Sequence, residues 1–396
     1  MHRKKYILPV IVLAQFCCTS LWFAGNGVMG DLVSNFGLAQ SALGHLTSAV
    51  QLGFISGTLV FAILTIADRY SPSKVFAGSA LLGAAFNMGL MWSGNTLGTM
   101  LAGRFLTGFF LAGIYPVGMK IAADHFERQL GQSLGFLVGA LVVGTAFPHL
   151  LKGISAGIPW RAILGATSGL AVAGGLLMVA WVPDGPYRQA GQRMDFSACM
   201  RVFREAEFRS AAFGYFGHMW ELYTFWAFVP VMLQTYVARH PATSLNVPVI
   251  SFLVIGLGGA ACVLGGFLSQ KLGVKRTAFG ALALSGLCCL VSPVAFELPV
   301  AWGFVGFLIF WGLVVIADSP LFSTLVAQSA APAIKGTALT IVNSIGFAIT
   351  IVSIQWINAL RNWTDSDAIY LFLAIGPALG LWALSRGGRG EKAPQR

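Results

Sequence analysis

The sequence predicts an all-α membrane protein with twelve transmembrane helices in two pseudo-symmetric halves of six. The first observation behind this fold class is composition: 56% of the 396 residues are hydrophobic and 10% are charged, whereas a soluble domain carries about 25% charged residues. The second is the length of the apolar runs, about 20 residues, which suits membrane helices rather than the short alternating strands of a barrel. The third is an internal repeat that divides the chain near its middle.

The repeat is visible in two features. A short basic loop around Arg69 follows the second apolar run, and a similar loop occurs 202 residues later around Lys271. A glycine followed eight residues later by a proline also occurs inside an apolar run in each half, as Gly108 with Pro116 and as Gly312 with Pro320. Duplicated helical bundles are typical of secondary transporters, whose substrate sites lie between the repeats.

The apolar runs place six spans in each half. In the first half they cover 6–28, 41–66, 75–93, 97–121, 130–149 and 160–182, and in the second half 208–232, 247–268, 277–296, 299–327, 336–360 and 366–384. The domains are therefore an N-terminal half (1–182), a linker (183–207) and a C-terminal half with a short tail (208–396). The linker is polar and has the composition of a surface helix around 196–203. The first span is too long for a removed signal peptide and lacks a cleavage pattern.

The distribution of Lys and Arg predicts the orientation. With a cytoplasmic N-terminus, twenty of the 25 Lys and Arg residues fall in cytoplasmic segments, four in outer segments, and Arg104 within a span. Cytoplasmic loops carry such an excess of positive charge. We therefore expect a multi-pass protein of the bacterial inner membrane with both termini in the cytoplasm. The net charge of +11 then reflects topology, and we expect no nucleic-acid partner.

Two motifs resemble those of the major facilitator superfamily, and the resemblance covers nearly the whole chain. Ile66-Ala67-Asp68-Arg69 resembles the core of the loop after the second helix of that family, although Ser71 and Pro72 replace a Gly and an Arg of its pattern. Arg104, with Gly108 four residues later, resembles a pattern of the fourth helix. The resemblance implies the fold of that family, alternating access, and loops that gate the cytoplasmic side through Asp68, Arg69, Lys271 and Arg276.

Charged side chains within the predicted spans are the sharpest indication of function, because each costs roughly 2.5–3.5 kcal/mol on insertion scales and is rarely kept without a task. Glu221 lies about 13 residues into the seventh span, close to the bilayer midplane, and His218 shares its helix face. Asp318 lies beside Pro320, whose missing N–H weakens the helix there. Glu221, His218, Asp318 and Arg104 are thus the candidates for proton coupling or substrate binding, although polar pairs that only fix helix packing are the alternative. Asp318 is expected either to carry a proton or to pair with Arg104 or Lys335.

Polar and aromatic residues of other spans are candidates for a substrate cavity. In the superfamily, helices one, four, seven and ten line the cavity, so the resemblance suggests Gln15, Tyr115, Trp220 and Tyr223. Asn343 adds a polar group in the eleventh span. In the fifth span, three glycines spaced four residues apart predict a smooth strip for a close helix contact: Gly131, Gly135 and Gly139.

Other classes of protein lack the residues that they need. The sequence has no nucleotide-binding P-loop and no nucleophile–base arrangement, so we expect neither an enzyme nor ATP-driven transport. His218 and Glu221 are too few to form a metal site, and no cofactor is implied. The expected partners are a small-molecule substrate, a proton and the lipid bilayer, and the sequence holds no signal for an oligomeric state.

Three functions remain open. The first is proton-coupled uptake of a small polar or anionic metabolite by alternating access, with a weak resemblance to cyanate-type and small-organic-anion permeases. The second is proton-driven efflux of amphiphilic compounds, which Trp220, Tyr223 and Trp226 favour but the fifth span does not, since Pro148 lies far from Gly139. The third is a sensor without turnover, for which the linker and tail offer no signalling domain.

Overall fold

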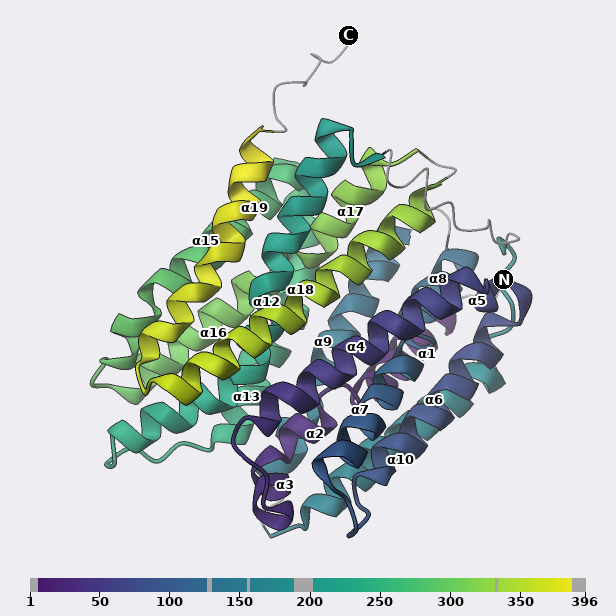
Figure 1. Cartoon of the computed structure of the whole chain (residues 1–396). Coiled ribbons are helices and arrows are strands. Elements are labelled where there is room, and N and C mark those ends of the chain that lie inside the picture. Colours follow the sequence, from purple (N-terminus) through teal and green to yellow (C-terminus); the bar gives the residue numbers. More distant parts are fainter. Residues whose placement is uncertain (1–5, 127–129, 155–156, 189–201, 332–333, 387–396) are drawn as a thin grey trace.

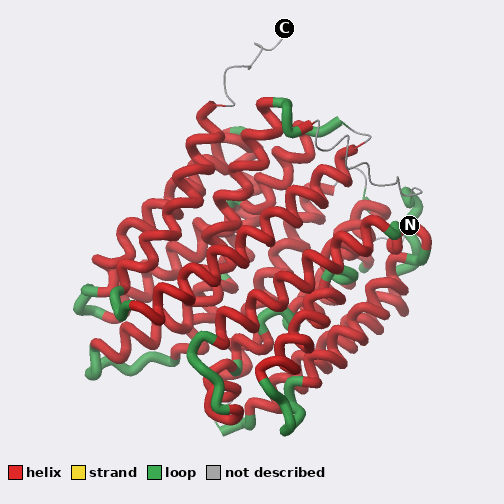
Figure 2. The backbone as a smooth tube through the Cα atoms, viewed as in Figure 1, coloured by secondary structure: helices red, strands yellow, loops and turns green. Residues whose placement is uncertain are grey.

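The computed structural model describes residues 6–126, 130–154, 157–188, 202–331 and 334–386, and these residues form helices joined by short connections, without a strand (Figure 1; Figure 2). The helix expected around 196–203 falls mostly outside this range. Both α1 and α19 have their terminal ends on one side of the bundle, which we call the terminal face; the other side is the opposite face (Figure 1).

The N-terminal half contains six helical segments, several of them interrupted. In order these are α1 (Ile7–Thr19) with α2 (Ala24–Gly27) and α3 (Met29–Phe36), α4 (Ala42–Ile63), the short α5 (Ile66–Arg69) leading into α6 (Pro72–Gly89), α7 (Leu97–Leu111) with α8 (Tyr115–His125), α9 (Leu130–Ile154), and α10 (Trp160–Trp181).

The C-terminal half repeats this order. Its segments are α12 (Ala206–Arg239), α13 (Val247–Gly256) with α14 (Gly258–Leu272), α15 (Val274–Phe296), α16 (Ala301–Ala317) with α17 (Ser319–Ser329), α18 (Lys335–Trp363), and the 3₁₀ helix η3 (Asp367–Ala374) with α19 (Ile375–Arg386). Side chains on the outside of the bundle are large and apolar, as a lipid-facing surface requires; Trp302 and Val294 are both 69% exposed.

Each of the twelve predicted spans coincides with a helix or an interrupted pair. Nine of the helical stretches in the described part of the chain are long and apolar enough to cross a membrane by length and composition. Several helices extend beyond the expected ends of their spans. Helix α12 continues to Arg239, beyond the expected end at 232, because hydropathy marks the membrane edge and not the helix end. The first span is not continuous: α1 ends at Thr19 and α2 begins at Ala24.

The internal repeat is preserved in how helices approach each other. A Cβ atom on Gly108 of α7 would lie 2.0 Å from the carbonyl oxygen of Val50 in α4, and one on Gly312 of α16 would lie 2.1 Å from the carbonyl oxygen of Val254 in α13. No side chain fits at either distance, so each glycine sets the spacing of its helix pair. In each half the helix is then interrupted. The proline of the repeat lies in the first turn of the helix that follows the interruption, α8 in the first half and α17 in the second.

We expect Gly312→Ala to destabilise the protein, because the added methyl group must push α16 away from α13. Gly306→Ala, on the same helix, is the matched control, since a Cβ atom there meets nothing within 4 Å. Thermal unfolding of both variants in detergent checks this expectation. Equal stability of the two would show that the close approach is not required.

Candidate functional site

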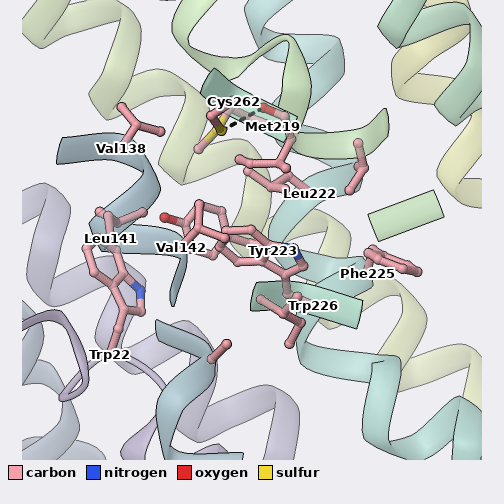
Figure 3. Close-up of a cluster of buried hydrophobic side chains, with 14 of the residues drawn as sticks. Trp22, Val138, Leu141, Val142, Met219, Leu222, Tyr223, Phe225, Trp226 and Cys262 are labelled. Atoms are coloured by element: carbon pink, nitrogen blue, oxygen red, sulfur yellow. Dashed lines mark hydrogen bonds between the residues drawn. The ribbon is translucent and has the colours of Figure 1, made fainter. Parts of the chain in front are cut away.

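A cluster of aromatic rings fills the seam between the two halves. We call Trp22, Phe23, Phe54, Tyr223, Trp226 and Phe347 the ring cluster; all six are buried. The Trp22 ring of the N-terminal half lies 5.8 Å from Tyr223 and 5.8 Å from Phe347 of the C-terminal half, with interplanar angles of 28° and 26°. Figure 3 shows Trp22 beside Leu141, and Tyr223 extending from α12 towards Val142 of α9. The seam is therefore an aromatic surface built by both halves.

Several hydrogen-bonding groups at this seam have no partner among the described residues. They are the indole N–H groups of Trp22 and Trp226 and Nε2 of His149. The rings connect them, because Phe23 lies 6.4 Å from the Trp226 ring and 6.5 Å from the His149 ring. Buried polar groups are normally satisfied, so these groups are candidate contacts for a bound molecule.

A histidine and a carboxylate meet inside the C-terminal half. Nδ1 of His218 in α12 lies 2.8 Å from Oδ1 of Asp318, which stands between α16 and α17, and the two side chains are 1% and 0% exposed. Asp318 therefore faces His218, and not Arg104 or Lys335 as the sequence suggested, because α12 and the break in the tenth segment are in contact. Oδ2 of Asp318 and Nε2 of His218 have no hydrogen-bond partner in the described structure.

Glu221 lies one turn further along α12 and has a different environment. Its carboxylate accepts hydrogen bonds from Ser285 (2.9 Å), Cys289 (3.3 Å) and Trp311 (2.6 Å), and it is fully buried. No cation lies within ion-pair distance of it in the described residues. Burial in the membrane penalises the charged form of the carboxyl group, while three donors favour it.

Arg104 occupies the break in the first segment. Its guanidinium donates to the carbonyl oxygens of Leu21 (3.1 Å) and Trp22, which lie at this break, and to Oδ1 of Asn87 (3.3 Å). Asn87 in turn donates to Ser168 of α10. The side chain is 1% exposed. All three acceptors of the guanidinium belong to the N-terminal half.

The candidate lining residues lie in different places. Tyr115 and Tyr223 pack with the buried core at the seam. Gln15 is fully buried against Gly118, and its amide atoms have no hydrogen-bond partner among the described residues. Trp220 points to the twelfth segment instead, where its indole N–H donates to the carbonyl oxygen of Phe372 (3.1 Å). Asn343 is half-buried in α18.

The predicted gating residues of the first copy, Asp68 and Arg69, bond within their own half. Asp68 pairs with Lys120 of α8 at 2.9 Å, and Nε of Arg69 donates to Thr65 at 3.1 Å. In the described residues, Lys271 and Arg276 of the second copy have no carboxylate within 4 Å. On the terminal face, the loop of the first half is thus tied to its own fourth segment.

Hydrogen bonds that join the halves lie towards the opposite face. Gln355 of α18 donates to Ser48 of α4 (2.8 Å), Asn358 donates to the carbonyl oxygen of Ser41 (3.1 Å), and Asn246 donates to the carbonyl oxygen of Gly153 (3.0 Å). Each residue is near the opposite-face end of its helix. The two halves are therefore joined by hydrogen bonds on the opposite face.

Of the glycine strip in α9, Gly139 makes the closest approach, since a Cβ atom on it would lie 3.3 Å from the carbonyl oxygen of Gly259 in α14. A Cβ atom on Gly135 would meet no atom within 4 Å. The surroundings of Gly131 lie outside the described part of the structure. The described residues contain no group of three or more His, Cys, Asp or Glu placed to hold a metal ion.

Sequence reasoning missed His149 and Asn87. The fifth span was expected to end at 149, so His149 counted as a boundary residue, whereas α9 continues to Ile154. Asn87 was an uncharged residue in the third span. A search for every polar side chain within the spans, extended by one turn at each end, would have found both.

Comparisons with known proteins agree with this architecture. Residues 11–354 match the family model described as Major Facilitator Superfamily. The uncharacterized transporter YgaY of Escherichia coli O157:H7 is 24% identical over 168 residues, which are 40% of this chain and 41% of that protein. The 3-(3-hydroxy-phenyl)propionate transporter of Escherichia coli (strain K12) is 23% identical over 158 residues, 39% of this chain and 38% of that protein. The chain thus matches less than half the length of these relatives.

Two solved structures share the whole fold. One is a bacterial homologue of the human lysosomal transporter Spinster in an inward-facing, unoccupied conformation, with a TM-score of 0.74, 14% identity and full coverage of both chains. Another is a variant of the nucleoside transporter NupG, with a TM-score of 0.72 and 14% identity, covering 97% of this chain and 100% of that one. At this identity the likeness concerns the fold alone.

Proposed function

Since the chain belongs to the major facilitator superfamily, a family of secondary transporters that work by alternating access, we propose that it couples the uptake of a small organic anion to the entrance of protons. The family and the fold are those of transporters, not enzymes. The two halves rock about the seam, so that the ring cluster and its neighbours are reached from one side at a time. Substrate and proton shift this balance through their different affinities for the two states.

The buried His218–Asp318 pair carries the proposal of proton coupling. An isolated ionised carboxylate in the bilayer is costly, and His218 compensates it only while the imidazole is protonated. Binding and release of a proton therefore change the charge of this site within the membrane. Glu221 adds a second carboxyl group, one helical turn from His218. The same helix, α12, also provides Tyr223 and Trp226 of the ring cluster. A proton bound here can thus alter how the halves meet.

The halves are closed towards the opposite face, which supports an inward-open state. If the terminal face is cytoplasmic, as the excess of Lys and Arg suggests, the opposite face is the outer side. The hydrogen bonds of Gln355, Asn358 and Asn246 between the halves then form the closed outer gate. Opening that gate would break these hydrogen bonds, and closing the inner side would bring the loop of Asp68 towards the C-terminal half.

The ring cluster and its unpartnered donors favour a planar substrate with an acidic group. Aromatic faces stack on such a ring, and the N–H groups of Trp22 and Trp226, with His149, suit its oxygen atoms. Arg104 is already engaged by backbone carbonyls, so these donors are the binding groups that we assign. A relative that matches part of this chain is a 3-(3-hydroxy-phenyl)propionate transporter. The compound in that name is a planar ring with an acidic group.

A thermal-stability screen of the purified protein tests the substrate class. We expect aromatic carboxylic acids, beginning with 3-(3-hydroxyphenyl)propionate, to stabilise the protein more at pH 5.5 than at pH 7.5. Aliphatic acids of equal charge are the matched control for the ring. Stabilisation by hydrophobic cations alone would contradict uptake of an anion and favour the efflux of amphiphilic compounds, which an uncharged aromatic seam also suits.

We expect Glu221→Gln to abolish proton-driven accumulation while leaving exchange of substrate. The amide keeps the shape of the side chain but cannot release a proton, and its NH₂ group faces a donor, which costs about 1–3 kcal/mol of stability. Uptake of the best acid from the screen into proteoliposomes, with and without a pH gradient, measures both activities. Glu297→Gln, a change at an exposed carboxylate, is the control. Full accumulation in Glu221→Gln would remove this residue from the mechanism.

A further inference from the structure

A cavity of about 550 Å³ opens on the terminal face of the C-terminal half. It lies between the start of α12, the start of α15, the end of α17 and the end of α19, away from the seam. Its polar lining consists of Glu207, Ser210, Lys275, Arg276, Gln328 and Ser329. The exposed ring of Phe279 also lines it, so the cavity reaches the lipid-facing surface.

The two cations of this cavity lack counterions. No carboxylate in the described residues lies within 4 Å of Lys275 or Arg276, and Glu207 in the same lining does not pair with them. Two cations of the matching region in the N-terminal half are paired: Lys120 bonds Asp68 at 2.9 Å and Arg188 bonds Asp184 at 2.6 Å. The cavity therefore has positive charge that the described protein does not neutralise.

The internal repeat shows what occupies the matching place in the N-terminal half. Helix α6 begins at Pro72 and α15 at Val274, 202 residues later, so the starts of these helices are equivalent. At the start of α6, the carboxylate of Asp184 accepts a hydrogen bond from Ser71 at 2.6 Å. Arg188 donates to the carbonyl oxygens of Asp68 and Tyr70 beside it. In the N-terminal half, the equivalent place is thus occupied by a carboxylate of the chain itself, that of Asp184.

We propose that the cavity binds a phosphate-bearing anion, above all the headgroup of an anionic lipid. Lys275 and Arg276 would bind the phosphate oxygens, as the chain's own Ser71 and Arg188 bind the Asp184 carboxylate in the first half. The hydroxyl groups of Ser210 and Ser329 add neutral donors. A position at the end of the helices, open to the lipid-facing surface, places a headgroup at this depth while its acyl chains remain in the bilayer. The inference does not depend on which molecule is transported.

Lipid titration followed by native mass spectrometry tests the proposal on the delipidated full chain. We expect phosphatidylglycerol to bind the wild type more tightly than phosphatidylcholine does. The double variant Lys275→Gln/Arg276→Gln should bind phosphatidylglycerol about thirtyfold more weakly, since each cation near a membrane surface contributes roughly a factor of five. The control, Lys74→Gln/Lys335→Gln, removes the same charge from the same face outside the cavity and should bind as the wild type does.

Two further arms identify the source of the anion and guard against misfolding. Glu207→Gln removes a repulsive charge and should strengthen binding, a gain that a damaged protein would not show. Stabilisation of the wild type, but not of the double variant, by inorganic phosphate alone would assign the cavity to a soluble phosphate instead of a lipid. Equal binding of phosphatidylglycerol by the double variant and its control, without a phosphate effect, would overturn the proposal.

Discussion

Asp318→Asn is expected to abolish proton-driven accumulation of substrate and to spare substrate exchange. The carboxyl group faces His218 at 2.8 Å without exposure to solvent, so Asn keeps the size of the side chain but removes the charge that makes the pair sensitive to protons. Exchange needs only the rocking of the halves with substrate bound, and it does not need a change of protonation.

Proteoliposomes measure both activities on one preparation. Accumulation is followed under an inward pH gradient, and exchange is followed between equal internal and external pools at one pH. Asp365→Asn, in an exposed loop at the opposite face, is the control. His218→Gln should share the phenotype of Asp318→Asn, because either change breaks the pair. If Asp318→Asn accumulated substrate normally, the proton would have to bind elsewhere.

Arg104→Gln is expected to cost more stability than any other change in the N-terminal half. The guanidinium supplies donors to the carbonyl oxygens of Leu21 and Trp22 at the break between α1 and α2, and an unsatisfied backbone group within the bilayer costs several kcal/mol. Arg104→Lys should be intermediate, since an ammonium group cannot reproduce the planar fork.

Thermal unfolding in detergent distinguishes a structural role from ligand binding for Arg104. Arg361→Gln, at the end of α18, is the control for loss of one positive charge. Stability in Arg104→Gln equal to that of the wild type, together with loss of anion binding, would make Arg104 a substrate ligand and contradict its role at the helix break.

The sequence predicted the twelve segments, the repeat and the three buried charges, because each rests on a strong local signal. The length of each apolar run indicates a membrane span, and a charged residue within such a run is easily recognised. The partners of those charges were not predictable, since they depend on contacts between distant segments. His218 and Asp318 are 100 residues apart in the chain, and only the packing of α12 against the break after α16 brings them together.

The break after Thr19 shows the same limit. No proline or charge marks it, and the apolar run continues through it. Arg104, from another segment, donates to the carbonyl oxygens of Leu21 and Trp22 at this break. Helix rotation was similarly hidden: Trp220 and Tyr223 are three residues apart, yet one bonds the twelfth segment and the other joins the ring cluster. Hydropathy alone does not say which face of an apolar helix meets which neighbour.

The most direct test of the central claim, that substrate and proton move together, is the internal pH of proteoliposomes during substrate influx. An inward gradient of the best acid from the stability screen is imposed at equal pH on both sides, with a trapped fluorescent pH indicator. We expect the wild type to acidify the lumen as substrate enters, and Asp318→Asn to leave the internal pH unchanged. Influx without a pH change in the wild type, or with alkalinisation as in antiport, would contradict proton-coupled uptake.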